Sequence, residues 1–346
     1  MYDQEEARLV EEIKRRSPHR VLLQLPEGLK PLAAGLAERL RRASGVEVFV
    51  SGDPCYGACD LALQEMKQLR ADLLIHVGHA EIPGETADDG IVYVEARSDM
   101  KIEKPLAEAL ELLKNEKNIG LAASVQHVHL LKSAREALER AGKTVWIGRA
   151  SGRLKHNGQV LGCDYGSVIS VADKVDAFLV IAGGDFHALG VSLSTGKKVI
   201  VADSYQQTAR DAAPLVDKIL RQRYATIVKF NQTRRVGIIV GLKSGQMNLA
   251  VARRLRGLLE ESGKTCTLIA SSELIPESIE SFTDLEGFVE VACPRISIDD
   301  RGRYHKPVVN PDEALIAIGK KSWEEYGKHT EETWDRTSAA TDETAS

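Results

Sequence analysis

The sequence has no long apolar run. No stretch approaches the roughly 18 consecutive apolar residues that a membrane-spanning helix needs. The first residues read MYDQEEARLVEEIKRR, an amphipathic charged pattern that lacks the apolar centre of a secretory signal. We therefore expect a cytoplasmic protein that makes no contact with membranes.

The sequence also has few cysteines. An odd number of cysteines, five in 346 residues, argues against a disulfide framework, and the chain lacks the close C-x2-C pair of most structural zinc sites. The five cysteines can therefore be metal-bound, reactive or buried thiols.

A net charge of −4 gives no general attraction for nucleic acid, so we expect no direct nucleic-acid binding. We expect the one local basic cluster to be a solvated surface: Arg221, Arg223, Arg234 and Arg235.

What the sequence does contain is a pattern that occurs three times, a short apolar run followed by a helix-period segment. The copies begin with VLLQLPEG at Val21, IGLAAS at Ile119 and VGIIVG at Val236. Short β-branched runs that alternate with helices indicate parallel strands joined by right-handed crossovers. We predict an α/β fold of three tandem related domains in a pseudo-threefold arrangement. Each domain is expected to be a parallel sheet of about four strands with flanking helices.

The predicted domains cover residues 1–98, 99–205 and 206–323, each long enough for its own core. Pro307–Val309 is a candidate for a short fourth strand of the third copy. Residues 324–346 lose the apolar periodicity and end in small polar residues. We expect them to form a frayed helix and a partly disordered tail.

Each copy has one glycine- or proline-flanked cysteine after a strand. Cys59 lies in SGDPCYGACD, Cys163 in LGCDYG and Cys293 in VACPRISIDD. Functional groups of parallel sheets gather at the carboxyl ends of the strands, and a pseudo-threefold axis would bring three such edges together. Three thiolates suit a 4Fe-4S cluster with one iron free of protein ligands. Zinc and plain buried thiols are the alternatives.

The other two cysteines have simpler interpretations. Cys55 and Cys59 form a C-x3-C pair that resembles the start of the radical-SAM motif C-x3-C-x2-C, but Ala62 stands at the third cysteine position. Cys55 is then either an extra thiol near the site or a bystander to the cluster, and we favour the bystander. Cys266 lies inside the apolar strand TCTLIA, where a thiol behaves as a small hydrophobic side chain.

Four glycine-rich strand ends are candidates for binding an adenosyl ligand, because glycine lets the backbone approach a ligand closely. They are LPEG, VGHAEIP, AGGDFHALG and GLKSGQ. Two histidines occupy matching places in the first two copies, and the alternative for each is a loop-anchoring role. The candidate ligand-binding residues are Glu27, Gly28, His79, Gly183, Gly184, His187 and Gln246.

Several of these strings together resemble a known family. They are SGDPCYGACD, VGHAEIP, LGCDYG, AGGDFHALG, VADSY, GLKSGQ and VACPRISIDD. The chain from about Val21 to about Asp312 is similar to the archaeal diphthamide-biosynthesis enzymes, a family of 3-amino-3-carboxypropyl transferases. All three cysteine contexts match in order.

The resemblance implies a homodimer and an atypical radical-SAM reaction. It assigns the 4Fe-4S cluster to Cys59, Cys163 and Cys293, and makes S-adenosylmethionine the cosubstrate. In that reaction the bond from sulfur to the γ-carbon breaks and gives a 3-amino-3-carboxypropyl radical. The fragment is added to C2 of a histidine on translation elongation factor 2, and methylthioadenosine is released. An electron donor is also implied.

Two other functions are kept as alternatives. Quinolinate synthase also resembles three α/β repeats that each give one cysteine to a cluster, but it acts as a dehydratase on small molecules. A protein-binding scaffold without catalytic activity would use the repeats alone. Release of methylthioadenosine distinguishes the transferase from the dehydratase, and a brown colour after anaerobic purification distinguishes a cluster protein from a scaffold.

Overall fold

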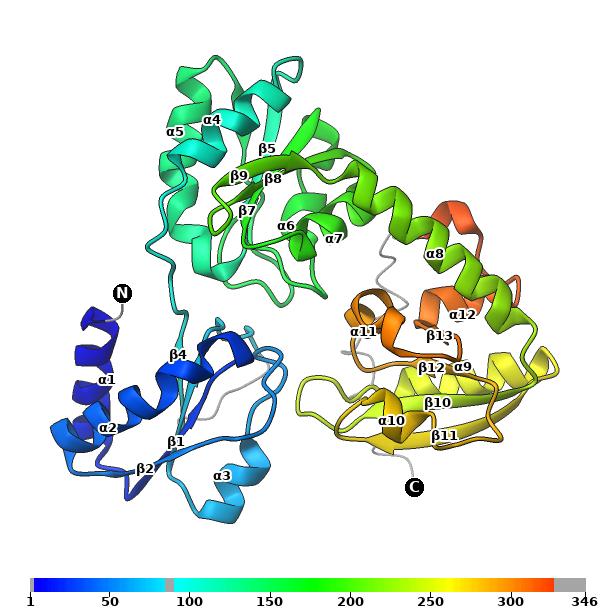
Figure 1. Cartoon of the computed structure of the whole chain (residues 1–346), viewed down its shortest axis with the longest axis horizontal. Helices are drawn as coiled ribbons and strands as arrows, with labels where there is room; N and C mark the ends of the chain where they lie inside the picture. The colour runs from blue at the N-terminus through cyan, green and yellow to red at the C-terminus, as the bar shows by residue number, and fades with distance from the viewer. Residues whose placement is uncertain (1–2, 85–89, 327–346) are drawn as a thin grey trace. The chain divides into compact units, whose positions relative to one another are not determined.

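The computed structural model describes residues 3–84 and 90–326. It contains three sheets, with strand orders β2-β1-β3-β4, β6-β5-β7-β8-β9 and β11-β10-β12-β13 (Figure 1). All strand pairs of the first and third sheets are parallel, as are the pairs of β5 with β6 and β7. The chain divides into two compact units, residues 1–187 with 200–210, and residues 188–199 with 211 onward. The predicted α/β class is confirmed, with three sheets in which parallel pairs predominate.

The first copy has the four strands predicted for it. They are β1 (Arg20–Gln24), β2 (Glu47–Val50), β3 (Leu73–Val77) and β4 (Ile91–Val94). The α-helices are α1 (Asp3–Arg16), α2 (Ala33–Ser44) and α3 (Leu63–Leu69), and a 3-10 helix η1 (Glu27–Leu32) follows β1.

The second copy has five strands, one more than predicted. They are β5 (Asn118–Ala123), β6 (Thr144–Trp146), β7 (Ala177–Ala182), β8 (Lys198–Asp203) and the additional β9 (Thr208–Asp211). Its helices are α4 (Glu103–Leu112), η2 (Val125–Leu130), α5 (Leu131–Arg140), α6 (Gly166–Ile169), η3 (Ala172–Lys174) and α7 (Phe186–Thr195).

The third copy includes the short fourth strand that the sequence indicated. Its strands are β10 (Arg235–Gly241), β11 (Thr265–Ser271), β12 (Gly287–Glu290) and β13 (Val308–Val309). The helices are α8 (Ala213–Asn231), α9 (Leu249–Glu261), α10 (Pro276–Ile279), α11 (Pro294–Asp299), η4 (Arg301–Arg303), α12 (Pro311–Ala317) and η5 (Trp323–Glu325). The expected tail falls largely on residues 327–346, which lie outside the described residues.

In each copy, an acidic side chain binds the backbone at the start of the first strand. Asp72, Asp176 and Glu286 each stand just before the third strand of their copy. Their carboxylates accept hydrogen bonds from the first backbone N–H of β1, β5 and β10, at 3.1, 2.7 and 3.4 Å. These bonds satisfy backbone donors at the strand starts and help to set the register of the first and third strands. The three copies are thus related in detail as well as in outline.

Each copy has a core of its own. Ile75, Leu179 and Val289 occupy equivalent positions of β3, β7 and β12, and all three are 0% exposed. Strands buried on both faces read as continuous apolar runs, which explains why the repeat was visible in the sequence. Among the described residues, no helix combines the length and the apolar character required to cross a bilayer.

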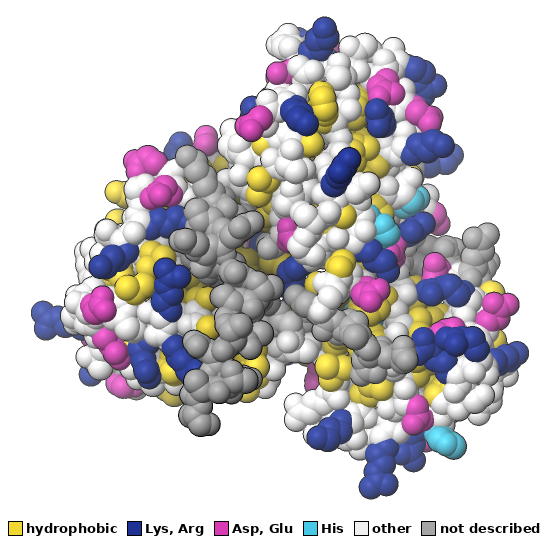
Figure 2. Space-filling model, turned by 180° about the vertical axis from the view of Figure 1, so that it is seen from behind, with side chains coloured by type: hydrophobic (Ala, Val, Ile, Leu, Met, Phe, Trp, Pro, Cys, Tyr) yellow, Lys and Arg dark blue, Asp and Glu magenta, His cyan; other side chains and the backbone are white. Residues whose placement is uncertain are grey.

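The prediction that the basic cluster is exposed to solvent is wrong for Arg223, which is 0% exposed. Its guanidinium donates to both carboxylate oxygens of Glu313, at 2.6 and 2.5 Å, and to the carbonyls of Ser297 and Val308. A buried arginine requires such complete pairing. Elsewhere, basic and acidic side chains are interspersed over the face seen in Figure 2, in keeping with the small net charge of −4.

Candidate metal centre

The loop that carries Cys59 is tied to the end of β1. Gln24, the last residue of β1, donates from Nε2 to the carbonyl of Asp60 at 2.7 Å and accepts at Oε1 from the N–H of Ala62 at 3.1 Å. The Asp60 carboxylate in turn accepts from the N–H of Tyr56 at 3.2 Å. These bonds hold Cys59, which is half-buried, at the carboxyl end of the first sheet.

A carboxylate also organises the loop of Cys163. Asp164 accepts hydrogen bonds from the N–H groups of Gly166, at 2.8 Å, and Arg153, at 2.7 Å. The Arg153 guanidinium donates from Nη1 to the sulfur of Cys163 at 3.4 Å. A cation on the sulfur favours the thiolate over the thiol, which is the form that binds metals.

Cys293 stands at the beginning of α11. Its N–H donates to Glu290 at 3.0 Å, and Pro294 follows as the first helical residue. Glu290 is 0% exposed, and burial raises the pKa of its carboxyl well above the ordinary value. The third thiol is thus half-buried beside a buried carboxyl group that binds the backbone N–H of the same cysteine.

Sequence reasoning found the three thiols but missed the carboxyl groups that position their loops. Asp60 and Asp164 each directly follow their cysteine, so the shared Cys-Asp pair was a signal available in the sequence. Cys59 and Cys163 belong to one compact unit and Cys293 to the other. That the three sulfur atoms share one metal cluster stays a prediction.

A second group of metal-ligating side chains lies in the first copy. Cys55, His76 and His79 each place one ligand atom within 4.8 Å of the other two. Cys55 is 3% exposed and His76 is 0% exposed. Burial lowers the pKa of His79 to about 4 and that of His76 well below its ordinary value, so both imidazoles are neutral at pH 7. The sequence interpretation did not include His76 and did not connect Cys55 to either histidine.

The candidate ligand-binding residues occupy several environments. Glu27 and Gly28 are exposed, and Glu27 forms an ion pair of 2.7 Å with Lys30. His187 is half-buried at the beginning of α7, and Gln246 is buried after β10. Their contact with a ligand stays a prediction.

Gly183 and Gly184 have structural reasons to be glycine. A Cβ at Gly183 would lie 2.5 Å from the ring of Tyr205, so the ring can pack there only against glycine. Gly184 has a φ of 83°, and its N–H donates to Asp203 at 3.0 Å. Both residues shape the loop after β7, whether or not a ligand binds there.

Cys266 lies in β11 and is half-buried, packed against the core of the third copy. Burial raises the pKa of its thiol to about 11. A thiol with so high a pKa is a poor metal ligand and a slow nucleophile at neutral pH.

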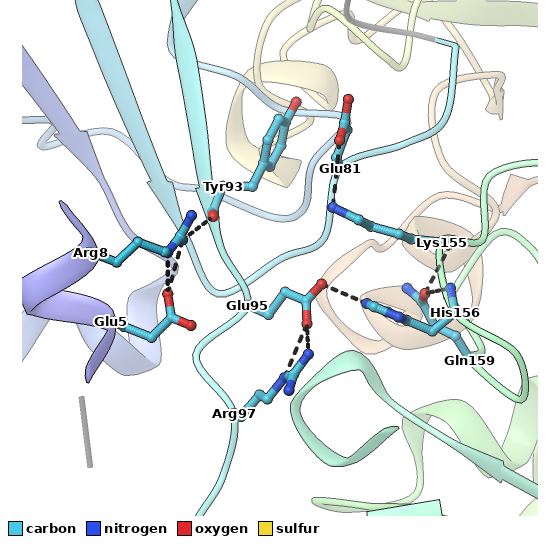
Figure 3. A network of polar contacts seen from close by, with 9 residues as sticks. All are labelled: Glu5, Arg8, Glu81, Tyr93, Glu95, Arg97, Lys155, His156 and Gln159. Carbon is cyan, nitrogen blue, oxygen red and sulfur yellow. Dashed lines mark hydrogen bonds and ion pairs between the residues drawn. The ribbon is translucent and has the colours of Figure 1, made fainter. Parts of the chain in front are cut away.

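A polar network joins the first two copies, and all of its residues lie in the same compact unit (Figure 3). His156 bonds through Nε2 to the carboxylate of Glu95 at 2.6 Å, and Lys155 pairs with Glu81 at 3.5 Å. Gln159 accepts from the N–H groups of Lys155 and His156, both at 3.0 Å. The network therefore fastens the segment before Cys163 to the copy that carries Cys59.

These features define a class of protein that is built from three α/β repeats, each with one half-buried thiol in a loop at a strand end. A family profile described as "Putative diphthamide synthesis protein" matches residues 25–327. The chain belongs to this diphthamide synthesis family.

Comparisons with individual proteins lead to the same assignment. The chain is 38% identical to "2-(3-amino-3-carboxypropyl)histidine synthase" of Pyrococcus horikoshii, over 92% of this chain and 90% of that protein. It is 28% identical to subunit 1 of the synthase of the same name from Schizosaccharomyces pombe, over 90% of this chain and 73% of that protein. The crystal structure of Dph2 from Pyrococcus horikoshii with a 4Fe-4S cluster matches with a TM-score of 0.83 and 37% identity, covering 92% of this chain and 91% of that chain.

Proposed function

We propose that this chain catalyses the first step of diphthamide biosynthesis, the transfer of a 3-amino-3-carboxypropyl group from S-adenosylmethionine to a histidine of translation elongation factor 2. The observation that carries the proposal is the ordered loop around each of Cys59, Cys163 and Cys293, in a chain 38% identical to a named synthase. Membership of the family and the cluster in the solved relative support it.

The three thiols are the proposed ligands of a 4Fe-4S cluster. When bound, such a cluster with an open iron supplies the electron and the Lewis acid for breaking the bond between sulfur and the γ-carbon. The donor set fits, because half-buried thiols at strand ends combine metal access with exclusion of bulk water. At Gly57 a Cβ would come within 3.3 Å of the Cys59 sulfur, so glycine leaves the room that a cluster beside this thiol needs.

The strand-end loops are the proposed binding surface for S-adenosylmethionine. Exposed backbone at Gly28 and Gly183 offers close approach to the adenosyl part. The imidazoles of His79 and His187 and the amide of Gln246 supply polar contacts for its amino-acid part. Glu27 and Gly184 complete the proposed set, although the N–H of Gly184 is already bonded to Asp203.

The proposed reaction also requires partners. The acceptor is elongation factor 2, an external donor supplies electrons, and two copies of the chain form a homodimer in the cytoplasm. The chain's own residues bind and orient S-adenosylmethionine, so that one carbon faces the open iron and other reactive groups are kept away.

One experiment tests the activity. The cluster is reconstituted anaerobically and incubated with reductant, elongation factor 2 and S-adenosylmethionine labelled in the carboxypropyl part. We expect label on the factor and one methylthioadenosine for each transfer. Quinolinate formed from iminoaspartate and dihydroxyacetone phosphate would favour the dehydratase instead, and a colourless protein without turnover would favour the scaffold.

Matched variants test the ligands. Cys59→Ala, Cys163→Ala and Cys293→Ala should each lower bound iron and abolish methylthioadenosine formation, because three protein ligands are needed to hold the cluster. Cys266→Ala is the control, and should keep iron and activity. Full activity in any of the first three variants would contradict the assignment.

A further inference from the structure

Cys55, His76 and His79 form a compact set of soft and borderline donors that the proposed reaction does not use as a set. Cys55 lies in the loop after β2, His76 lies in β3, and His79 follows two residues after β3 ends. Their three ligand atoms lie within 4.8 Å of one another. A thiol and two imidazoles at the end of a buried sheet are the donor types that Zn²⁺ prefers.

The hydrogen bonds determine which nitrogen of His76 carries the proton. The amide of Gln24 is oriented by two backbone groups, because its Nε2 donates to the carbonyl of Asp60 and its Oε1 accepts from the N–H of Ala62. Oε1 also lies 2.8 Å from Nδ1 of His76. That oxygen can only accept, so Nδ1 carries the hydrogen and Nε2 of His76 has a lone pair.

The lone pair points at the second histidine. Nε2 of His76 lies 3.0 Å from Nδ1 of His79. In a tetrahedral zinc site with Zn–N bonds of about 2.0 Å, two ligand nitrogens are about 3.3 Å apart. The two nitrogens are therefore already at nearly the required separation, and each ring would only have to turn until its lone pair faces the ion. Thiolate and nitrogen ligands are about 3.6 Å apart in such a site, and a shift of about 1 Å would bring Cys55 into place.

Gln24 supplies the support that metal-bound histidines usually have. Such histidines donate their second ring N–H to a carboxylate or carbonyl oxygen, which sets the tautomer and the direction of the ring. His76 donates from Nδ1 to the amide oxygen of Gln24 at 2.8 Å. The imidazole is therefore oriented for coordination before any ion binds.

The repeat gives an independent reason to consider this position. Leu73 of β3 and Gly287 of β12 both pair with the second residue of the first strand in their copy. His79 comes six residues after Leu73, and Cys293 comes six residues after Gly287. His79 thus stands at the repeat position of a proposed cluster ligand, two residues past the carboxyl end of β3.

We propose that Cys55, His76 and His79 bind one Zn²⁺ ion, separate from the cluster, through Sγ, Nε2 and Nδ1. The fourth position would be left to water or to a bound ligand, as in zinc sites with three protein ligands. On binding, Cys55 releases its thiol proton, whereas the proton of His79 moves from Nδ1 to Nε2 and is retained. Nε2–H of His79 can then still donate to a ligand carboxylate.

The test measures metal rather than activity. Anaerobically reconstituted holoprotein is equilibrated with Zn²⁺ and gel-filtered, and zinc and iron are determined by elemental analysis. We expect one zinc per chain in addition to four irons. X-ray absorption at the zinc edge should show one sulfur neighbour at about 2.3 Å and two nitrogens at about 2.0 Å.

Variants locate the ion. Cys55→Ser and His79→Gln should each weaken zinc binding at least about 100-fold, and Gln24→Leu, which removes the support of His76, about 10- to 100-fold. Cys266→Ser is the matched control and should bind zinc as the unaltered chain does. Circular dichroism establishes that each variant is folded.

Zinc binding can be tested separately from the cluster and the transferase activity. Cys163→Ala should lose iron and keep zinc, because Cys163 belongs to the proposed cluster and lies in the second copy. Holoprotein that retains no zinc after gel filtration would overturn the proposal. So would a zinc edge with more than one sulfur neighbour, or a folded Cys55→Ser variant with unchanged zinc affinity.

Discussion

At the scale of single residues, Arg153 brings a positive charge to one of the proposed cluster ligands. Its guanidinium donates to the sulfur of Cys163 at 3.4 Å. Positive charge and N–H donors at the sulfurs stabilise the reduced cluster and raise its reduction potential.

We therefore expect Arg153→Met to lower the reduction potential of the reconstituted cluster by on the order of tens of millivolts. A redox titration followed by electron paramagnetic resonance would measure the shift. Arg149→Met removes a nearby exposed arginine and is the control, with little expected change. An unchanged potential in Arg153→Met would argue against a cluster at Cys163.

Cys266 gives a prediction based on its pKa of about 11. At pH 8 a thiol with the ordinary value of 9.0 is about one-tenth thiolate, whereas Cys266 is about one-thousandth thiolate. Higher intrinsic nucleophilicity offsets part of this difference. We expect alkylation of Cys266 by iodoacetamide to be at least about tenfold slower in the folded, cluster-free protein than in the urea-unfolded chain, measured by peptide mass spectrometry. Equal rates would contradict the environment described for Cys266.

At the scale of elements, the pairing of glycine with phenylalanine on neighbouring strands occurs twice. Gly120 of β5 is the register partner of Phe178 of β7, and Gly237 of β10 is that of Phe288 of β12. A Cβ at Gly120 would lie 2.2 Å from the Phe178 ring. In the first copy two leucines occupy the same paired positions of β1 and β3, so a different combination of sizes fills the equivalent space.

Gly120→Ala should therefore destabilise the second copy by about 2–4 kcal/mol, since neither a buried ring nor a sheet backbone can move away cheaply. Urea unfolding would measure this. Gly257→Ala is the matched control, because Gly257 is exposed on α9 with open space around it, and alanine there should stabilise by up to about 1 kcal/mol. Adding Phe178→Leu to Gly120→Ala should recover part of the loss, and no recovery would contradict the steric explanation.

The elements were predictable where one local pattern sufficed. Apolar runs predicted the buried strands, and the three cysteine loops were recognised by their equal place in each copy. The fifth strand, β9, was missed because TARD has no apolar pattern, and its pairing comes from its place beside β8. The burial of Arg223 was missed for a similar reason, since its partner Glu313 lies 90 residues further along the chain.

At the scale of the whole molecule, the contact between the first two copies depends on Glu95. Its burial acts to raise the pKa of the carboxyl, but bonds from His156 and Arg97 outweigh burial and lower that pKa below the ordinary 4.5. A lowered pKa means that the bond stabilises the folded chain fully above pH 4.5, and that this contribution is lost as the pH falls through the folded value.

We expect Glu95→Gln to weaken the contact by about 1 kcal/mol at pH 7. Hydrogen exchange in residues 149–160 should become faster in the variant, and the difference from the unaltered chain should shrink as the pH falls below 4.5. Glu47→Gln removes an exposed partner of Arg20 and should leave exchange in this segment unchanged. Unchanged exchange in Glu95→Gln would show that other contacts hold the segment.

The division into two compact units has a consequence for assembly. The proposed ligands are 104 and 130 residues apart in the chain (163 − 59 and 293 − 163), and only the last belongs to the second unit. A nascent polypeptide emerging from the ribosome therefore cannot complete the ligand set until residue 293 has been synthesised. Cluster loading would then act as a checkpoint that waits for the second unit, and chains truncated before Cys293 should emerge as colourless protein.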